Sequence, residues 1–345
     1  MVTLPFPPNE VRWPRDRGGH YESFYLKANA PDRPLGLWIK HNLLAPRGSD
    51  APPFGESWAV LMDGERGVHR VAKRVVPSRE LDLAPADGIV RLGEAVLTED
   101  AARGTIPAEG GLPDAAWELE LTGDEPPIIH YPHAWMYTAA FPKKKVLTPR
   151  PGLVFRGNMR VGDTEVDVDG WTGLQGHNWG RSHAHDYAYG NAGRFRERED
   201  ARFDGFTARI QLGPLTTPQL TACILRLGST DYAFNSKRRS IGAGHHNFPR
   251  WSFQVEGKGG YRLSGHVEAE PSRYVGLCYA DPTGSLADCL NTKFGRGELL
   301  LERKVVGRWE EVQRLTGDAF ELEFLFRDMD HGVPVLGGDP FESIS

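Results

Sequence analysis

Alternating hydrophobic and polar positions recur along the chain and predict short β-strands. In residues 251–256, Trp, Phe and Val alternate with Ser, Gln and Glu, and a second alternation fills 261–267 after a glycine-rich turn. Because successive side chains of a strand face opposite sides, these runs predict a hairpin with one apolar face. Similar runs occupy 36–44, 57–62, 206–212, 220–227, 274–279 and 320–326, and long stretches with helical spacing are lacking. The pattern predicts an all-β protein with little helix, built as an antiparallel sandwich or barrel.

The length of the chain, 345 residues, allows two domains or one large β domain. A segment dense in charge, residues 193–204, follows the most distinctive block of the sequence. We expect this segment to link an N-terminal domain, residues 1–192, to a C-terminal domain, residues 193–345.

Composition and charge exclude several classes of partner and location. The formal net charge is −5, and basic residues are scattered apart from the triplets 143–145 and 237–239, which we interpret as solvated turns. We therefore expect no nucleic-acid partner. Three cysteines without CxxC spacing favour a reducing compartment over a disulfide framework. The sequence has neither an apolar signal segment nor an apolar run of ~20 residues, so it predicts a cytoplasmic protein with no transmembrane segment. The sequence gives no prediction of the oligomeric state.

The block from 171 to 190, WTGLQGHNWGRSHAHDYAYG, is the most informative part of the chain. It combines three histidines, two tryptophans and two tyrosines with Gln175, Asn178 and Asp186. An unpartnered buried polar group costs about 1–3 kcal/mol, so core segments are rarely this polar. Surface loops rarely carry so much aromatic bulk. The block is typical of a pocket wall, with aromatic faces for an apolar ligand and polar groups that orient it.

Three histidines of this block form a candidate metal site. On a strand His183 and His185 share a face, and His177 could supply a third ligand. The glutamate that a similar metal-binding barrel signature places a few residues later is missing, since 187–190 read Tyr-Ala-Tyr-Gly. Alternatively, the histidines form hydrogen bonds in a polar pocket or cap the irregular backbone of the motif.

Glu22 is a lone carboxylate within the aromatic run 19–25, GHYESFY. If it is buried, desolvation raises its pKa, which suits a general acid. Alternatively, it is a structural partner of an arginine or a backbone amide. The motifs GxGxxG, GxxxxGK[ST], GxSxG and HExxH are absent, so the sequence predicts no cofactor.

Two stretches of the chain resemble a known family. They are residues 20–29, HYESFYLKAN, followed by LGLWI at 35–39, and residues 173–183, GLQGHNWGRSH, followed by YAYG at 187–190. Both are similar to the hydroxyneurosporene synthase (carotenoid 1,2-hydratase) and AttH-like group of lipocalin-related proteins. The resemblance implies two consecutive lipocalin-like antiparallel β-barrels with an apolar cavity and cofactor-independent chemistry. The positions that match its motifs are Glu22, Gln175, His177, Asn178, Trp179 and His183.

Three hypotheses of function follow. The first is a cofactor-independent enzyme that hydrates, eliminates or cyclises a hydrophobic unsaturated small molecule of isoprenoid or polyketide-like type. In it Glu22 or Asp186 is the acid, His177, Asn178 or His183 positions water, and the aromatic wall stabilises cationic charge. The wall and ligand-binding positions are Trp38, Trp58, Gln175, Trp179 and Tyr189. The second hypothesis is a non-catalytic carrier of a hydrophobic ligand, and the third is a metal-dependent enzyme that uses His177, His183 and His185.

Overall fold

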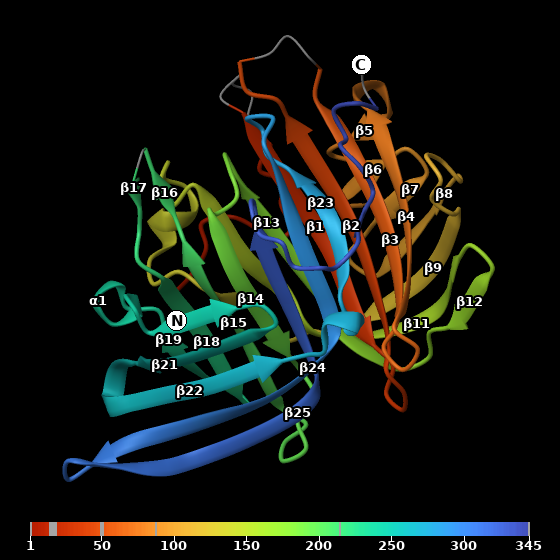
Figure 1. Ribbon diagram of the computed structural model, residues 1–345. Helices are drawn as coiled ribbons and strands as arrows, with labels where there is room; N and C mark the ends of the chain where they lie inside the picture. Colours follow the sequence, from red (N-terminus) through yellow and green to blue (C-terminus); the bar gives the residue numbers. More distant parts are fainter. Residues whose placement is uncertain (1, 14–18, 49–51, 87, 214, 344–345) are drawn as a thin grey trace.

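Two antiparallel β-sheets make up most of the computed structural model, which describes residues 2–13, 19–48, 52–86, 88–213 and 215–343 (Figure 1). Within these ranges the only α-helix is α1 (Lys237–Ser240), and the remaining helical turns are short 3₁₀ segments. The predicted all-β class with little helix is confirmed. No helix in the described ranges has the length and apolar character needed to cross a membrane.

The first sheet contains the N-terminal half of the chain. Its strands follow the order β4-β3-β2-β1-β13-β11-β9-β8-β7-β6-β5, and β10 and β12 pair with β11. The bounds are β1 His20–Asn29, β2 Leu35–Ala45, β3 Phe54–Asp63, β4 Val68–Pro77, β5 Leu81–Asp82, β6 Val90–Leu92, β7 Ala95–Leu97, β8 Ala101–Ile106, β9 Ala115–Thr122, β10 Ile128–Ile129, β11 Lys144–Val161, β12 Thr164–Asp167 and β13 Trp171–Gly180.

The second sheet contains the C-terminal half. Its order is β19-β18-β15-β14-β25-β24-β22-β21-β20, β23 pairs with β24 and β26, and β16 and β17 form a separate hairpin. The bounds are β14 Asp186–Ala192, β15 Ala201–Arg209, β16 Gln211–Leu212, β17 Leu215–Thr216, β18 Leu220–Leu227, β19 Thr230–Phe234, β20 Gly244–Asn247, β21 Arg250–Glu256, β22 Tyr261–Glu268, β23 Val275–Ala280, β24 Leu286–Val305, β25 Arg308–Phe326 and β26 Val335–Leu336. The predicted hairpin at 251–267 is β21 and β22.

The chain passes from the first sheet to the second between Gly180 and Asp186. The charged segment 193–204 was expected to link two barrels, and this is wrong: it contains the connection from β14 to β15 within one sheet and the start of β15. Its charge reflects an exposed connection, which occurs within sheets as well as between domains. In the described residues each strand order is an open path, ending at β4 and β5 in one sheet and at β19 and β20 in the other. The division at 192–193 stays a prediction.

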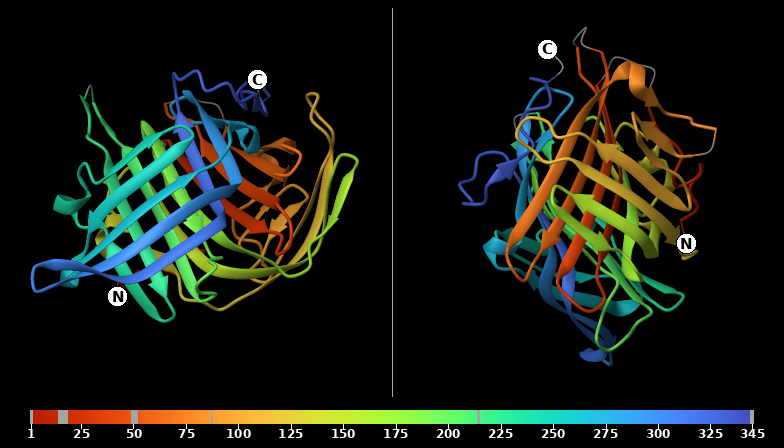
Figure 2. Two further views of the ribbon diagram at one scale, coloured as in Figure 1. Left: turned by 60° about the horizontal axis from the view of Figure 1, so that its bottom comes forward. Right: turned by 90° about the vertical axis from the view of Figure 1, so that its right-hand side faces the viewer.

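The two sheets lie side by side (Figure 2). A shared apolar layer packs them against each other. This layer takes Tyr25, Trp38 and Trp58 from the first sheet and Tyr187 and Leu325 from the second. Each sheet also has a core of its own on its other face. Strands such as β1 are therefore buried on both sides, and successive residues of β1 pack alternately into the layer between the sheets and into the core of the first sheet.

Glycine in the motif lets β1 and β13 pair at normal distance. A Cβ atom on Gly173 would lie 1.7 Å from the carbonyl oxygen of Lys27, and neither backbone can yield without breaking the pairing. We predict that Gly173→Ala lowers the free energy of unfolding by roughly 1–3 kcal/mol, the usual cost of overpacking.

The matched control is Gly193→Ala, where the nearest atom is the flexible end of Arg202 at 3.4 Å. Its unfolding free energy should change by about 0.5 kcal/mol or less in denaturant titrations. Equal stability of the two variants would contradict the close approach of β1 and β13.

Candidate active site

A cavity of about 750 Å³ lies between the two sheets. Its wall combines strands of both sheets with residues of the segment 130–146. The aromatic part of this wall includes Tyr21, Tyr25, Trp38, Tyr131, Phe141, Tyr187, Tyr189, Phe206 and Tyr279. The volume falls in the range of small-molecule sites, and the largely apolar lining matches their usual composition.

The imidazole of His183 is held at the cavity by Asp281. Its Nδ1 donates to Asp281 Oδ1 at 2.8 Å, and its backbone amide donates to the same oxygen at 2.7 Å. Arg327 donates from Nη2 to Asp281 Oδ2 at 2.5 Å. The ring of His183 also stacks on Tyr21, with centroids 4.1 Å apart. These contacts fix both the position of the ring and its tautomer.

The electrostatic surroundings keep His183 neutral. Burial lowers the pKa of His183, and the nearby cations Lys144 and Lys40 lower it further, while Asp281 opposes the shift. The pKa of Asp281 lies well below its ordinary value: burial raises it, but His183 and Arg327 outweigh burial. Since Asp281 accepts the Nδ1 proton, Nε2 carries the lone pair, and it has no hydrogen-bond partner among the described side chains. This arrangement is that of a general base.

A buried ion network joins the two sheets beside the cavity. Lys27 of β1 pairs with Glu321 of β25, and its Nζ lies 3.6 Å from Glu323 Oε2. Tyr187 donates its hydroxyl to Glu323 Oε1. Burial raises the pKa of Glu323, but Lys27 and the Tyr187 hydroxyl outweigh burial, and the result is a pKa of about 2. Glu323 is therefore a carboxylate at neutral pH.

Besides the exposed Lys143, two lysines line the cavity without making an ion pair in the described part of the chain. Lys40 Nζ lies 3.6 Å from the ring centroid of Tyr279, and Lys144 Nζ lies 4.1 Å from that of Tyr187. The triplet 143–145 was expected to be a solvated turn, and for Lys144 and Lys145 this expectation is wrong. Lys144 is half-buried at the cavity, and Lys145 is buried, with Nζ donating to the Ala139 carbonyl at 2.8 Å. The β11 strand begins at Lys144, whose side chain lines the cavity, whereas the side chain of Lys145 is buried outside it.

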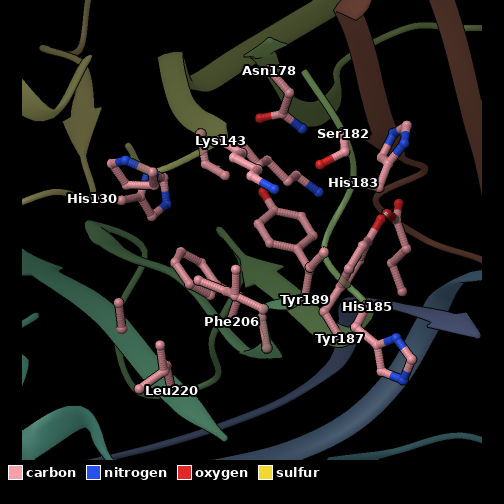
Figure 3. A pocket seen from close by; sticks show the side chains of 18 of the residues that line it. His130, Lys143, Asn178, Ser182, His183, His185, Tyr187, Tyr189, Phe206 and Leu220 are labelled. Atoms are coloured by element: carbon pink, nitrogen blue, oxygen red, sulfur yellow. Dashed lines mark hydrogen bonds between the residues drawn. The ribbon is translucent and has the colours of Figure 1, made fainter. Parts of the chain in front are cut away.

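A second histidine–aspartate pair lines another part of the cavity. His130 Nε2 donates to Asp204 Oδ1 at 2.8 Å, and Thr148 donates to Asp204 Oδ2 at 2.6 Å. In the view of Figure 3, His130 and His183 lie on opposite sides of the Tyr189 ring. Tyr189 donates its hydroxyl to Asp204 Oδ2 at 3.3 Å.

Four of the predicted site residues line the cavity: Trp38, Asn178, His183 and Tyr189. Asn178 Nδ2 lies 3.4 Å from the Tyr25 hydroxyl, and its Oδ1 is buried without a partner in the described residues. His185 also lines the cavity. The roles assigned to these residues stay predictions.

Glu22, His177 and Gln175 lie on the opposite face of β1 and β13, away from the cavity. His177 Nε2 donates to Glu22 Oε1 at 2.8 Å, and the other ring nitrogen of His177 contacts the Pro8 carbonyl. The expected raised pKa of Glu22 is wrong. Burial raises its pKa, but hydrogen bonds from His177, His20 and the Arg12 amide reverse the shift and lower it. Gln175 donates to Asn9, so this network holds the N-terminal segment against the sheet.

Three other predicted residues are also absent from the cavity wall. Trp179 packs against Phe6 and Tyr137 in a separate cluster. Trp58 is buried in the layer between the sheets, behind Trp38. Asp186 accepts hydrogen bonds from Arg209 and His246, which outweigh burial and lower its pKa, so it is no acid at neutral pH.

The three histidines of the candidate metal site do not converge. His177 is bound to Glu22 and Pro8 on one face of the first sheet, whereas His183 is bound to Asp281 at the cavity. The described residues contain no group of three metal-ligating side chains. His177 lies in β13 and faces away from the cavity, whereas His183 and His185 follow the end of β13 at Gly180, in the connection to β14, and both line the cavity.

The cavity residues that sequence reasoning missed come from distant segments. They are Lys27, Lys40, His130, Lys144, Asp281, Glu323 and Arg327. A signal was present for two of them, because Lys27 and Lys40 interrupt strongly apolar runs, FYLKAN and LWIKHNLL. A lysine inside such a run is rarely buried unless it is paired or functional.

The comparisons with known proteins give distant relatives. No family model matches the chain. Two proteins of Mycobacterium tuberculosis, the uncharacterized MT0513 (strain CDC 1551 / Oshkosh) and Rv0493c (strain ATCC 25618 / H37Rv), are each 27% identical over 300 residues, covering 82% of this chain and 81% of the relative. Their names give no activity.

Two solved structures align over most of the chain. A protein assigned as an AttH (NE1406) from Nitrosomonas europaea has a TM-score of 0.49 and 13% identity, covering 94% of this chain and 99% of that one. CghA, solved with Sch210972, has a TM-score of 0.49 and 11% identity, covering 95% and 96%. The name AttH appears both in the sequence resemblance and among these structures. The similarity to hydroxyneurosporene synthase rests on the sequence motifs alone. At this similarity neither structure assigns an activity to the chain.

We predict that Glu22 is structural and contributes to stability above pH 4.5. Its pKa is lower in the folded protein than its ordinary value of 4.5, so this contribution is lost as the pH falls through the folded pKa. Glu22→Gln should lower the free energy of unfolding at pH 7 by roughly 1.5–3 kcal/mol, the value of hydrogen bonds to a charged group.

The measurement is the unfolding free energy of wild type and variant between pH 7 and pH 3. The difference between the two proteins should shrink as the pH falls below 4.5. A constant difference across this range would show that the Glu22 charge has no part in stability.

Proposed function

We propose that this protein is a cofactor-independent enzyme that transfers a proton on a hydrophobic, unsaturated small molecule and so promotes elimination or cyclisation. The observation that carries the proposal is the neutral His183, oriented by Asp281 and left with a free Nε2 at an aromatic cavity. A base of this kind removes a proton from a carbon acid, such as the position next to a carbonyl group. The C–H electron pair passes to the substrate as an enolate, and the proton passes to Nε2.

The carboxyl groups at the cavity favour this chemistry over acid-catalysed hydration. The carboxyl groups that line it in the described residues are those of Asp281 and Glu323, and both have lowered pKa values. Protonation of an isolated alkene needs a neutral, strong acid in contact with carbon. Glu22 and Asp186, the acids expected from the sequence, are ionised and do not line the cavity.

The aromatic wall supplies binding for the body of the substrate. Tyr21 and Tyr279 flank the His183 ring, at centroid distances of 4.1 and 5.6 Å. A planar unsaturated group held against these rings would lie next to Nε2, and a closely held base gains from proximity as well as from its pKa. Trp38 and Tyr25 extend the wall along the first sheet.

Deuterium uptake tests the proposal without knowledge of the product. The protein is incubated in D₂O with long-chain β-keto esters and α,β-unsaturated ketones, and deuterium at carbon and new products are followed by mass spectrometry. We expect wild-type exchange and a loss of about 10²–10⁴-fold in His183→Asn, the usual contribution of a general base. Asp281→Asn should also reduce exchange because a neutral amide in place of the carboxylate stabilises the protonated His183 ring less.

The matched control is His245→Asn, because His245 is exposed and does not line the cavity. This variant should exchange at the wild-type rate. If the probes bind to the wild-type protein but neither exchange nor react, the enzyme proposal fails and the carrier alternative is favoured.

The pH profile provides a separate test of the base. Since the pKa of His183 is lowered below 6.5, the midpoint of the fall in kcat/KM on the acid side should lie below pH 6.5. A midpoint above pH 7 would show that another group is the base.

A further inference from the structure

The cavity contains more buried positive charge than its own carboxylates neutralise. Among the basic side chains that line the cavity, Lys27 is paired with Glu321 and Glu323, and Arg327 with Asp281. Lys143 is exposed to solvent, and the remaining two, Lys40 and Lys144, make no ion pair or side-chain hydrogen bond in the described ranges. Lys40 is only 5% exposed. The two ammonium groups therefore have hydrogen-bond donors that are available to a bound molecule.

Buried ammonium groups without partners are costly to the protein. Their contacts with the faces of Tyr279 and Tyr187 compensate in part, because a cation is attracted to the face of an aromatic ring. Removing a charge from water costs more than such a contact returns, so these contacts alone do not balance the desolvation. An anionic group between the two lysines would supply the missing Coulomb energy and accept their protons.

We propose that the cavity selects hydrophobic molecules that carry a carboxylate, and that Lys40 and Lys144 bind its oxygens. This assignment rests on the proposed function for the role of the cavity as a substrate site, and it narrows the substrate class. The apolar body would lie on the aromatic wall, with the carboxylate on the side of the cavity that Lys40 of β2 and Lys144 of β11 line.

A single carboxylate fits these donors better than a phosphate group. The cavity wall is predominantly apolar, and Arg327, the one arginine that the described residues contribute to it, is already bound to Asp281. Phosphate sites usually add backbone amides or a free guanidinium to match three oxygens and a second charge. Lys40 and Lys144 offer two separate point charges, and Glu323 nearby disfavours a second negative charge on the ligand.

The charge of Lys40 sets the pH range of this binding. Burial lowers the pKa of Lys40 to about 8, and Lys144 lowers it as well, whereas Glu56, Glu323 and Cys289 oppose the shift. Deprotonation above pH 8 removes one of the two cations, so carboxylate affinity should fall there. A bound carboxylate favours the charged form and moves this loss to higher pH.

Fluorescence titration with cis-parinaric acid and its methyl ester tests the assignment directly. The two probes share one apolar chain and differ in the negative charge. We expect wild type to bind the acid at least about tenfold more tightly than the ester at pH 7, as for a charge-assisted contact. Lys40→Met and Lys144→Met should each weaken acid binding by about tenfold and leave ester binding unchanged.

The control variant is Lys258→Met, because Lys258 is an exposed lysine on the surface that does not line the cavity. Its affinities should equal those of wild type. Retained ester binding also shows that a lysine variant is folded. Equal wild-type affinity for acid and ester, absence of acid binding, or equal losses for both probes in the lysine variants would each overturn the carboxylate assignment.

These outcomes separate the assignment from the enzyme proposal. Lysine-dependent acid binding without deuterium exchange of any probe would support the carboxylate site and remove the enzyme. Exchange of neutral carbonyl probes with no preference for the acid would retain the enzyme and overturn the carboxylate site.

Discussion

The ion pair between Lys27 and Glu321 is the contact on which the rest of the structure depends. Lys27 belongs to β1 of the first sheet and Glu321 to β25 of the second, and both side chains are almost fully buried. Two sheets that meet through apolar faces alone can slide over each other. A buried ion pair forms only when the sheets are in the one position that brings the two charges into contact. Removing one partner of such a pair typically costs about 3–5 kcal/mol, because the other charge remains buried. The pair thus fixes how the two halves of the chain meet.

The cavity exists because the layer between the sheets is incompletely filled and carries charge. Glu323 continues the network from Lys27 to the Tyr187 hydroxyl, and its carboxylate affects the lysines around the cavity. In a medium of low polarity these charges act on one another strongly. Lys40 and Lys144 lower the pKa of His183, and so the same charges that suit an anionic ligand keep the base neutral. The charges of Lys40 and Lys144 therefore affect both ligand binding and proton transfer.

The sequence allowed the fold class to be predicted but only part of the site. Alternation and turn residues indicated an all-β chain, because these are local properties of each strand. Of the motif that was expected to form a pocket wall, Asn178 and His183 line the cavity, whereas Gln175, His177 and Trp179 do not. Alternation also separates neighbours in sequence, and without the register no pattern tells which face meets the second sheet. Glu22 and His177 were therefore grouped with Asn178, although they face the other side of the sheet.

The remaining site residues could not be predicted because long-range pairing brings them together. Asp281 lies 98 positions from His183, and Glu323 lies 136 positions from Tyr187. Nothing local marks Asp281 as the partner of a histidine, since its own neighbours form an ordinary turn. Lys27 and Lys40 did carry a local signal, as lysines within apolar runs, and their burial confirms that such exceptions merit attention.

The state of the His183 ring is the most direct test of this account. Nitrogen NMR of the ¹⁵N-labelled protein, with the His183 signals assigned by their loss in His183→Asn, reports the charge and tautomer of the imidazole. We predict a neutral ring at pH 7 with the proton on Nδ1 and a pKa below 6.5. A positively charged ring at pH 7, or a neutral ring with the proton on Nε2, would contradict it.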